Sequence, residues 1–294
     1  MLEEREGISI SQASLMLGVP VPTIRSWERR YGVGIAARTQ GSHRRYDLKA
    51  LTELRDLRDA IAAGRRASHA ATLIKERSSG RRRSTYVDDI LDASAAFDTE
   101  GVRRSLDAAT LERGLFETID DVVLPALREI GSLWEAGRCD VANEHLASQE
   151  VRAWLSVELR KQPRRARKTG TILLACGPDD HHTIGLEAFY LILTRLGWSC
   201  RILGARTPTA SAVIAARESV ARAVVISSHL RSARKAAIRT LRALSSETEA
   251  TLFFAGNAFV SKTARQGVPG TYLGEELRRA AAILEETLGS EQSA

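Results

Sequence analysis

The chain has few cysteines and no long apolar run. Its 294 residues include only Cys139, Cys176 and Cys200, and cysteines so few and so scattered exclude a disulfide framework and a thiolate zinc site. No stretch approaches the roughly 18 uninterrupted apolar residues that a membrane-spanning helix needs, and no secretory signal opens the chain. We therefore expect a cytoplasmic protein whose thiols are reduced.

Charge is distributed unevenly along the chain. Residues 1–83 carry a net charge of +8, residues 84–162 carry −8 and residues 163–294 carry +7. This alternation indicates three modules, the first of which would attract polyanions. On charge alone, solvated helix faces would be the simpler explanation.

The amino-terminal residues carry a helix-turn-helix pattern. Residues 12–17 and 23–31 predict two short helices, with Ser11 as the cap of the first and a turn at Gly18. In the second helix Ile24 and Trp27 are three residues apart and face inward, which leaves cations on the outer face. We expect that helix to contact DNA through Thr23, Arg25, Arg29 and Arg30.

Residues 38–46 predict a small β-wing, because a glycine-centred turn is flanked by cations. Wings place cations on phosphates or at the minor groove, and the expected contacts are Arg38, His43, Arg44 and Arg45. The helix-turn-helix and the wing together resemble the MerR family of transcription regulators over roughly residues 8–75. Gly41 comes one place early, and Ser42 stands where that family often has glycine.

Periodicity and composition divide the chain into domains. A helix over 47–63 closes a winged-helix domain at 1–77, and a basic linker follows at 78–85. Residues 86–162 predict a four-helix bundle, with helices at 86–97, 99–111, 115–134 and 140–159. The last domain covers residues 168–290.

Residues 168–290 alternate strands with helices. Apolar runs predict strands at 171–176, 200–204, 223–228 and 251–255, a short strand at 271–273 and a final helix at 275–288. This order predicts a flavodoxin-like doubly wound domain. The fold class is therefore a multidomain α and α/β protein.

A polar motif, Asp180 to Gly185, follows the first of these strands. In its Asp-x-His-x-x-Gly spacing, the carboxylate of Asp180 accepts a proton from one ring nitrogen of His182, which leaves the other nitrogen for a metal. Gly185 lets a bulky ligand approach the backbone. Taken alone, the motif also fits a solvated loop histidine.

Two further motifs end strands downstream, Ser228-His229-Leu230 and Gly256-Asn257. With the first motif they resemble the base-off cobalamin-binding domain typified by methionine synthase. The resemblance implies that His182 is the lower axial ligand of cobalt and that Asp180 orients it. It further implies that the cofactor and its displaced nucleotide tail contact Gly185, Ser228, Leu230, Gly256 and Asn257, although Asn257 replaces the family's second glycine.

A polar corner ends the predicted bundle. Trp134 closes the third helix, and Val141, Glu144, His145 and Ser148 share one face of the fourth. A tryptophan wall with two polar side chains can form a pocket, and a capped bundle end is the alternative.

Trp-x9-Glu-His before a cobalamin domain resembles the CarH/LitR class of photoreceptors. The resemblance implies that Trp134 and Glu144 cover the upper face of adenosylcobalamin, with Val141 and His145 at further pocket positions. Glu135 stands where some members have the histidine that takes the upper face of cobalt after photolysis.

The resemblance implies a light-responsive transcription repressor and not an enzyme. An adenosylcobalamin-bound homo-oligomer, commonly a tetramer, would hold promoter or operator DNA in the dark, and photolysis of the cobalt–carbon bond would release it. Two alternatives remain, a light-independent cobalamin-sensing regulator and a corrinoid methyl-transfer protein. The basic winged helix does not fit the second, and the sequence shows no catalytic constellation.

Overall fold

The computed structural model describes residues 7–38, 44–62, 67–78, 85–161 and 168–290. It divides into two compact units, the first comprising Met1–Asp88 with Arg128–Val141 and the second Asp89–Leu127 with Ala142–Ala294. Among the described helices, none is long and apolar enough to cross a membrane.

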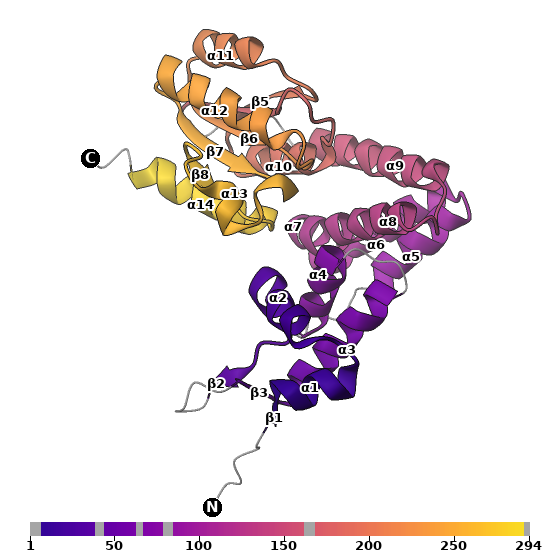
Figure 1. Cartoon of the computed structure of the whole chain (residues 1–294). Coiled ribbons are helices and arrows are strands. Elements are labelled where there is room, and N and C mark those ends of the chain that lie inside the picture. Colours follow the sequence, from indigo (N-terminus) through magenta and orange to yellow (C-terminus); the bar gives the residue numbers. More distant parts are fainter. Residues whose placement is uncertain (1–6, 39–43, 63–66, 79–84, 162–167, 291–294) are drawn as a thin grey trace, which may run out of the picture. The chain divides into compact units, whose positions relative to one another are not determined.

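The first unit contains the predicted helix-turn-helix, formed by α1 (Ile10–Leu17) and α2 (Val21–Tyr31) (Figure 1). The cap of α1 is Ser9 and not the expected Ser11. The Ser9 hydroxyl accepts from the Gln12 amide at 3.3 Å, and the Gln12 side chain accepts from the Ser9 amide at 2.9 Å. Because Gln12 lies three residues after Ser9, the two complete a capping box that fixes where the helix begins.

A three-stranded antiparallel sheet forms the base of the wing. Its strands β1 (Ile8–Ser9), β2 (Ala37–Arg38) and β3 (Arg44–Tyr46) lie in the order β1-β3-β2. Helices α3 (Leu48–Ala62) and α4 (Ala67–Ser78) complete the domain. Trp27 is buried in its core, as expected from its inward position, beside Ile24 and Leu54.

The middle of the chain is helical. Its elements are α5 (Thr85–Ala95), α6 (Thr99–Arg113), α7 (Leu115–Thr118), a π-helical turn η1 (Ile119–Val123), α8 (Leu124–Glu135) and α9 (Val141–Arg160). Within the second unit, Ser94 and Asn143 exchange two side chain to backbone hydrogen bonds of 2.9 Å. The Trp154 indole donates to Asp107 at 3.1 Å. These bonds join α9 to α5 and α6.

The rest of the second unit is a parallel sheet in the order β5-β4-β6-β7-β8. Its strands are β4 (Thr171–Cys176), β5 (Ser199–Gly204), β6 (Ala221–Ser227), β7 (Thr251–Ala255) and β8 (Thr271–Tyr272). This is the flavodoxin-like order, so the predicted fold is confirmed. The loops that carry the three motifs follow β4, β6 and β7, which are neighbouring strands, and therefore meet at one edge of the sheet.

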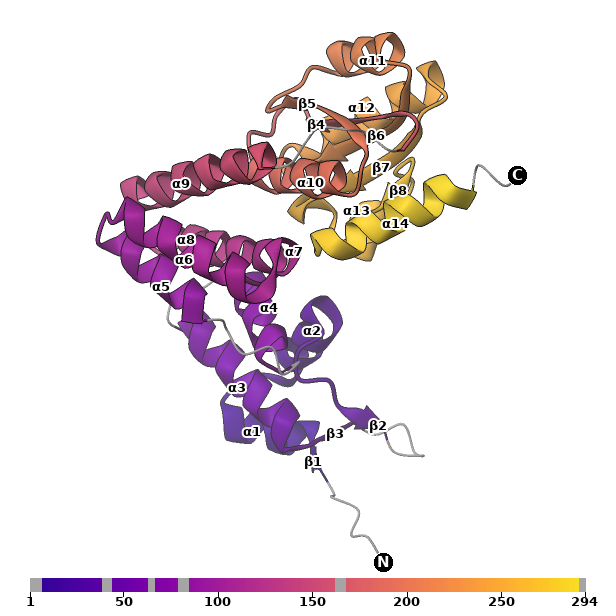
Figure 2. The same cartoon turned by 180° about the vertical axis from the view of Figure 1, so that it is seen from behind.

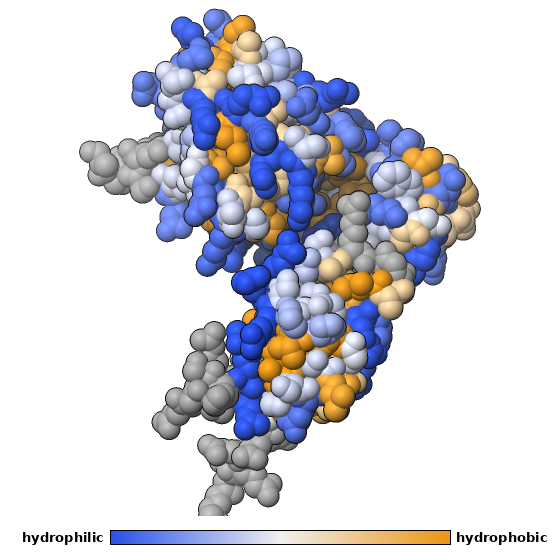
Figure 3. Space-filling model, in the orientation of Figure 1, coloured by the Kyte–Doolittle hydropathy of each residue, from blue (hydrophilic) through white to orange (hydrophobic). Residues whose placement is uncertain are grey.

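Helices cover both faces of this sheet. Figures 1 and 2 show α10 (Ile184–Arg195) and α14 (Leu277–Ser290) on one face and α11 (Thr209–Glu218) and α12 (Arg234–Glu247) on the other. A short helix, α13 (Lys262–Arg265), follows β7. Leu173, Val224 and Phe254 point from the strands into the core shared with α11 and α12. Over α12 hydrophilic residues predominate at the surface, as Figure 3 shows.

Candidate functional site

Asp180 lies at the centre of the candidate site, in the loop after β4. Its side chain is fully buried. One carboxylate oxygen accepts from the amide of His182 at 3.0 Å and lies 2.8 Å from His182 Nδ1. The other accepts from the Ser228 hydroxyl at 3.3 Å and from the amides of His229 and Leu230. A single carboxylate therefore joins the first predicted motif to the second.

These hydrogen bonds keep Asp180 ionised. Burial alone would raise the pKa of Asp180, but hydrogen bonds from the side chain and backbone of His182 and from the amides of Leu230 and His229 outweigh it. They hold the pKa of this carboxyl well below its usual range. An ionised carboxylate only accepts hydrogen bonds, so it selects the neutral tautomer of His182 in which Nδ1 carries the proton and Nε2 has a lone pair.

The free nitrogen of His182 is suited to ligate a metal. The side chain is 44% exposed, and no described residue forms a hydrogen bond with its Nε2. The described ranges contain no group of three or more histidine, cysteine or carboxylate side chains that could hold a metal ion by themselves. One oriented imidazole therefore fits a metal whose other ligands come from a cofactor.

Two other histidines lie beside His182. The ring of His181 stacks on it at 4.3 Å, and the ring of His229 lies 5.8 Å away. Burial lowers the pKa of His229 to about 4, with His182 adding to the effect and Asp180 opposing it, so His229 is neutral at pH 7. Because Asp180 orients His182 and not His181, the geometry favours the predicted ligand over its neighbour.

The two predicted glycines differ in their surroundings. A Cβ placed on Gly185 would lie 3.9 Å from the nearest heavy atom, Nε2 of His229, so the backbone there is open to a ligand. Gly256 has φ of 103°, and a Cβ on it would overlap the backbone of Ser228. Gly256 thus lets the loop after β7 pack on the loop after β6, and the exposed Asn257 begins a short 3-10 helix, η2 (Asn257–Phe259).

The residues predicted for the upper face are accessible. In the first unit, Trp134 exposes 49% of its surface and Val141 exposes 43%. In the second unit, Glu144 accepts from the Ser148 hydroxyl at 2.7 Å and lies 3.5 Å from Nε2 of His145. The Glu144 carboxylate is therefore oriented by its own helix, whereas the His145 side chain remains exposed.

The residues predicted to contact DNA differ in how exposed they are to solvent. Arg25, Arg29 and Arg30 are exposed on α2, and Thr23 is partly buried. Arg45 is exposed on β3. Arg38 lies opposite Arg44 in the antiparallel pairing of β2 with β3. His43 lies outside the described residues.

Glu28 is a residue that sequence reasoning missed. One of its oxygens accepts from the Ala36 amide at 3.1 Å and the other pairs with Nε of Arg44 at 3.0 Å. Glu28 thereby joins the second helix to the base of the wing and neutralises part of the charge of Arg44. The signal available in the sequence was one acidic residue among the cations of this helix.

Replacing Arg29 with alanine should weaken DNA binding and lower the slope of log affinity against log salt by about one, because one phosphate contact is lost. Arg45→Ala should have the same two effects on affinity and slope. Arg44→Ala should have a smaller effect on the slope, since Glu28 already compensates its charge. Fluorescence anisotropy over a salt series measures both quantities.

The matched control is Arg242→Ala, which removes an exposed arginine from α12. If Arg29→Ala and Arg45→Ala leave affinity and slope at the level of this control, α2 and the wing do not lie on the DNA.

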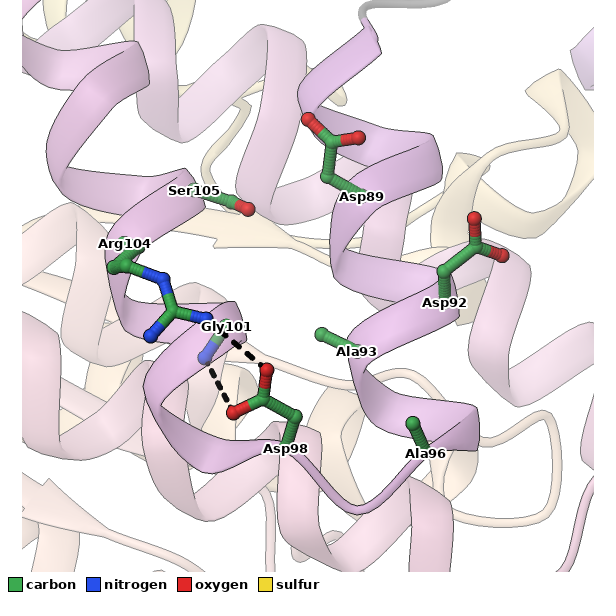
Figure 4. Close-up of a pocket in the computed structure, with 8 residues that line it drawn as sticks. All are labelled: Asp89, Asp92, Ala93, Ala96, Asp98, Gly101, Arg104 and Ser105. Atoms are coloured by element: carbon green, nitrogen blue, oxygen red, sulfur yellow. Dashed lines mark hydrogen bonds and ion pairs between the residues drawn. The ribbon is translucent and has the colours of Figure 1, made fainter.

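A hollow of about 400 Å³ between α5 and α6 contains none of the predicted site residues. In it, Asp98 accepts from the Gly101 amide at 2.8 Å and pairs with Arg104 at 3.1 Å, as Figure 4 shows. Asp89 and Asp92 lie on the facing helix. Three carboxylates around one guanidinium make the hollow anionic, which does not suit a phosphate-bearing ligand.

Comparison with known proteins identifies the domains in which these residues lie. A profile described as MerR HTH family regulatory protein matches residues 8–77. Two profiles described as B12 binding domain match residues 86–157 and 170–282. The HTH-type transcriptional repressor CarH of Myxococcus xanthus is 34% identical over 214 residues, which cover 68% of this chain and 71% of CarH. The chain belongs to the CarH family.

A second repressor matches the chain with similar identity and coverage. The HTH-type transcriptional repressor CarA of Myxococcus xanthus is 32% identical over 215 residues, covering 69% of this chain and 70% of CarA. Among solved structures, a monomethylamine corrinoid protein of Methanosarcina barkeri aligns with a TM-score of 0.59 at 16% identity, covering 70% of this chain and all of that one. That likeness establishes the fold alone. The membership in the CarH family that the motifs predicted is thus confirmed.

Proposed function

We propose that this chain is a DNA-binding repressor that uses adenosylcobalamin as a light-sensitive ligand. The observation that carries the proposal is the buried Asp180, which orients His182 while Nε2 stays free. Two B12-binding profiles and a MerR profile on one chain support the pairing of a cobalamin site with DNA binding.

The residues for each face of the cofactor follow from the motifs. On the lower face His182 would ligate cobalt, Asp180 would orient it, and the open backbone at Gly185 would admit the corrin or its tail. The remaining lower-face contacts are Ser228, Leu230, Gly256 and Asn257. On the upper face we assign Trp134, Val141, Glu144 and His145. When bound, adenosylcobalamin supplies a cobalt–carbon bond that visible light breaks.

In this proposal the protein contributes binding, orientation and assembly. In the dark, subunits would associate and present several winged helices to one DNA. Each helix carries arginines on its exposed face, so linked subunits bind far more tightly than one subunit alone. After light the subunits would separate, and the affinity of a single winged helix would not keep the operator bound.

One experiment separates this proposal from its alternatives. The protein is loaded with adenosylcobalamin in the dark, and duplexes that it retains are selected from a random DNA pool. Absorbance and DNA binding are then measured before and after green light. We expect the spectrum to change and the DNA to be released. DNA binding that follows cobalamin but ignores light indicates a light-independent sensor, and failure to select DNA favours a methyl-transfer protein.

Glu144→Ala should reduce the preference for adenosylcobalamin over methylcobalamin by about tenfold or more. A carboxylate that bonds a ribose hydroxyl contributes roughly 1–3 kcal/mol of selectivity, because a ligand without the hydroxyl leaves the carboxylate without that additional partner. Titration of the cobalamin-free protein with each cobalamin measures the ratio.

The control for this variant is Glu150→Ala, which removes another carboxylate from α9, one that pairs with Arg103 at 3.0 Å. Equal affinities of the unmodified protein for the methyl and adenosyl forms would reject the assignment of Glu144.

A further inference from the structure

Arg152 joins the helical region to the loop of the predicted cobalt ligand. It lies on α9, and its Nη2 donates to the Thr183 hydroxyl at 3.3 Å. Its Nε lies 3.4 Å from the carboxylate of Glu187, on the first turn of α10. Thr183 is the residue directly after His182 and is buried. The contact therefore reaches the side chain of the residue next to the predicted ligand.

Both hydrogen bonds of the Thr183 hydroxyl are made with the side chains of Arg152 and Glu187. Thr183 is the N-cap residue of α10, yet it makes no side-chain capping bond. Threonine at this position ordinarily accepts from an amide of the first turn. Here the hydroxyl donates to Glu187 at 2.6 Å and accepts from Arg152. The Thr183 side chain thus links the start of α10 to α9, whereas the Thr183 carbonyl still accepts from the Glu187 amide at 2.8 Å.

Helix α9 also carries three of the four residues assigned to the upper face, Val141, Glu144 and His145. Glu144 lies eight residues before Arg152, which is about 12 Å along a helix. Further along α9, Glu158 accepts from Arg195 at the other end of α10. Figures 1 and 2 show the C-terminal half of α9 meeting α10. Because a helix moves as a rigid element, Arg152 connects movement at Glu144 to the loop of His182.

We propose that Arg152, through Thr183 and Glu187, is a positioning residue for the cobalt ligand. It holds the His182 loop in the conformation that ligation requires and couples that loop to the upper-face residues of α9. This inference rests on the proposed function, since it takes His182 as the ligand. Its role differs from that of Asp180, which fixes the imidazole itself: Arg152 fixes the backbone that carries it.

The test uses the full chain with Arg152→Met, which keeps the apolar stem and removes the guanidinium. Amide hydrogen exchange of residues 182–187 in the cobalamin-free protein should become faster. Titration with hydroxocobalamin should show an affinity about tenfold lower, the low end of the range for groups that orient metal ligands. The visible spectrum should also contain a larger fraction of histidine-free cobalamin. Arg152→Lys should restore part of each change, because lysine keeps the charge but cannot engage both partners.

Arg103→Met is the matched control, since it removes another ion pair of α9, to Glu150 at 3.0 Å, without touching the loop. Should Arg152→Met match this control in exchange, affinity and spectrum, the inference fails. Thr183→Val tests the same contact if Arg152→Met does not fold, and an unchanged spectrum and affinity in that variant also overturns the inference. His182→Ala separates the two proposals: if it leaves the spectrum unchanged, the ligand assignment itself is wrong.

Discussion

Asp180→Ala is expected to lower the free energy of unfolding by on the order of 3 kcal/mol and to abolish histidine coordination of cobalamin. The variant leaves five donors without their acceptor: the amides of His182, His229 and Leu230, the Ser228 hydroxyl and the His182 ring. Each buried donor left unpaired costs about 1–3 kcal/mol unless water reaches it. Urea unfolding measures the first effect and absorbance titration the second.

Asp179→Ala is the control, because Asp179 is exposed in the same loop. His182→Ala should separate the two effects: it should eliminate ligation while leaving stability much less changed, since the imidazole is 44% exposed. If Asp180→Ala unfolds at the same urea concentration as Asp179→Ala, the buried carboxylate does not hold the loops together.

The contribution of Asp180 to stability should depend on pH. Its pKa is lowered in the folded protein, so the stabilisation is complete above the unfolded-state pKa of about 4 and is lost as pH falls through the folded pKa. The difference in stability between the unmodified protein and Asp180→Asn should therefore be constant near neutrality and shrink below pH of about 4. Unfolding curves of both proteins across acidic pH test this, and a gap that closes near pH 7 would contradict it.

The sheet of the second unit could be predicted because its signals are local. The apolar runs at 171–176 and 251–255 coincide with β4 and β7, since strands buried on both faces of a parallel sheet are continuously apolar. Their order followed from alternation with helices. In contrast, α4 (Ala67–Ser78) was not predicted. Its buried residues include Ala70 and Ala71, whose small side chains give a weak hydrophobic period.

The middle helices show a second limit of prediction from the sequence. Residues 115–134 were predicted as one helix, but a π-helical turn interrupts them at Ile119–Val123. Within that turn Asp120 is buried, and its carboxylate accepts from the amides of Leu277 and Arg278 at 2.7 and 3.0 Å. These amides belong to the first turn of α14, so Asp120 caps a helix 157 residues away in the sequence. Local periodicity carries no information on such a contact.

In the candidate site too, some contacts could be predicted from the sequence and others could not. The pairing of Asp180 with His182 was predicted, because two residues of one loop suffice to form it. The donors to the other carboxylate oxygen come from the loop after β6 and depend on strand order. Arg152 depends on the packing of α9 against α10, and Glu28 on the position of the wing. Each of these required the tertiary structure.

Light is expected to dissociate the adenosylcobalamin-bound oligomer into smaller species, and the light state of this chain should be readily reversible. In the proposed function, the adenosyl group would cover Trp134 in the dark, and light would remove that cover. Exposing an aromatic surface of this kind is unfavourable by about 25 cal/mol per Å². A shift that reburies it would alter the surfaces through which subunits associate. Size-exclusion chromatography in the dark, after light and after fresh adenosylcobalamin measures the transition.

Glu135 is the residue that should make the light state reversible. The resemblance to the CarH/LitR class implies that a histidine at that position would supply a nitrogen ligand and hold the shifted state, whereas a carboxylate would be a poorer partner for a metal that favours nitrogen here. We therefore expect fresh adenosylcobalamin to restore the oligomer of the unmodified protein and of the control Glu135→Gln. Glu135→His should block reassembly, because an imidazole beside Trp134 supplies the missing ligand. An elution volume indifferent to light would reject the photoreceptor proposal. A light state of the unmodified protein that never reassembles would reject only the role of Glu135, since dissociation would already have shown that light acts on the assembly.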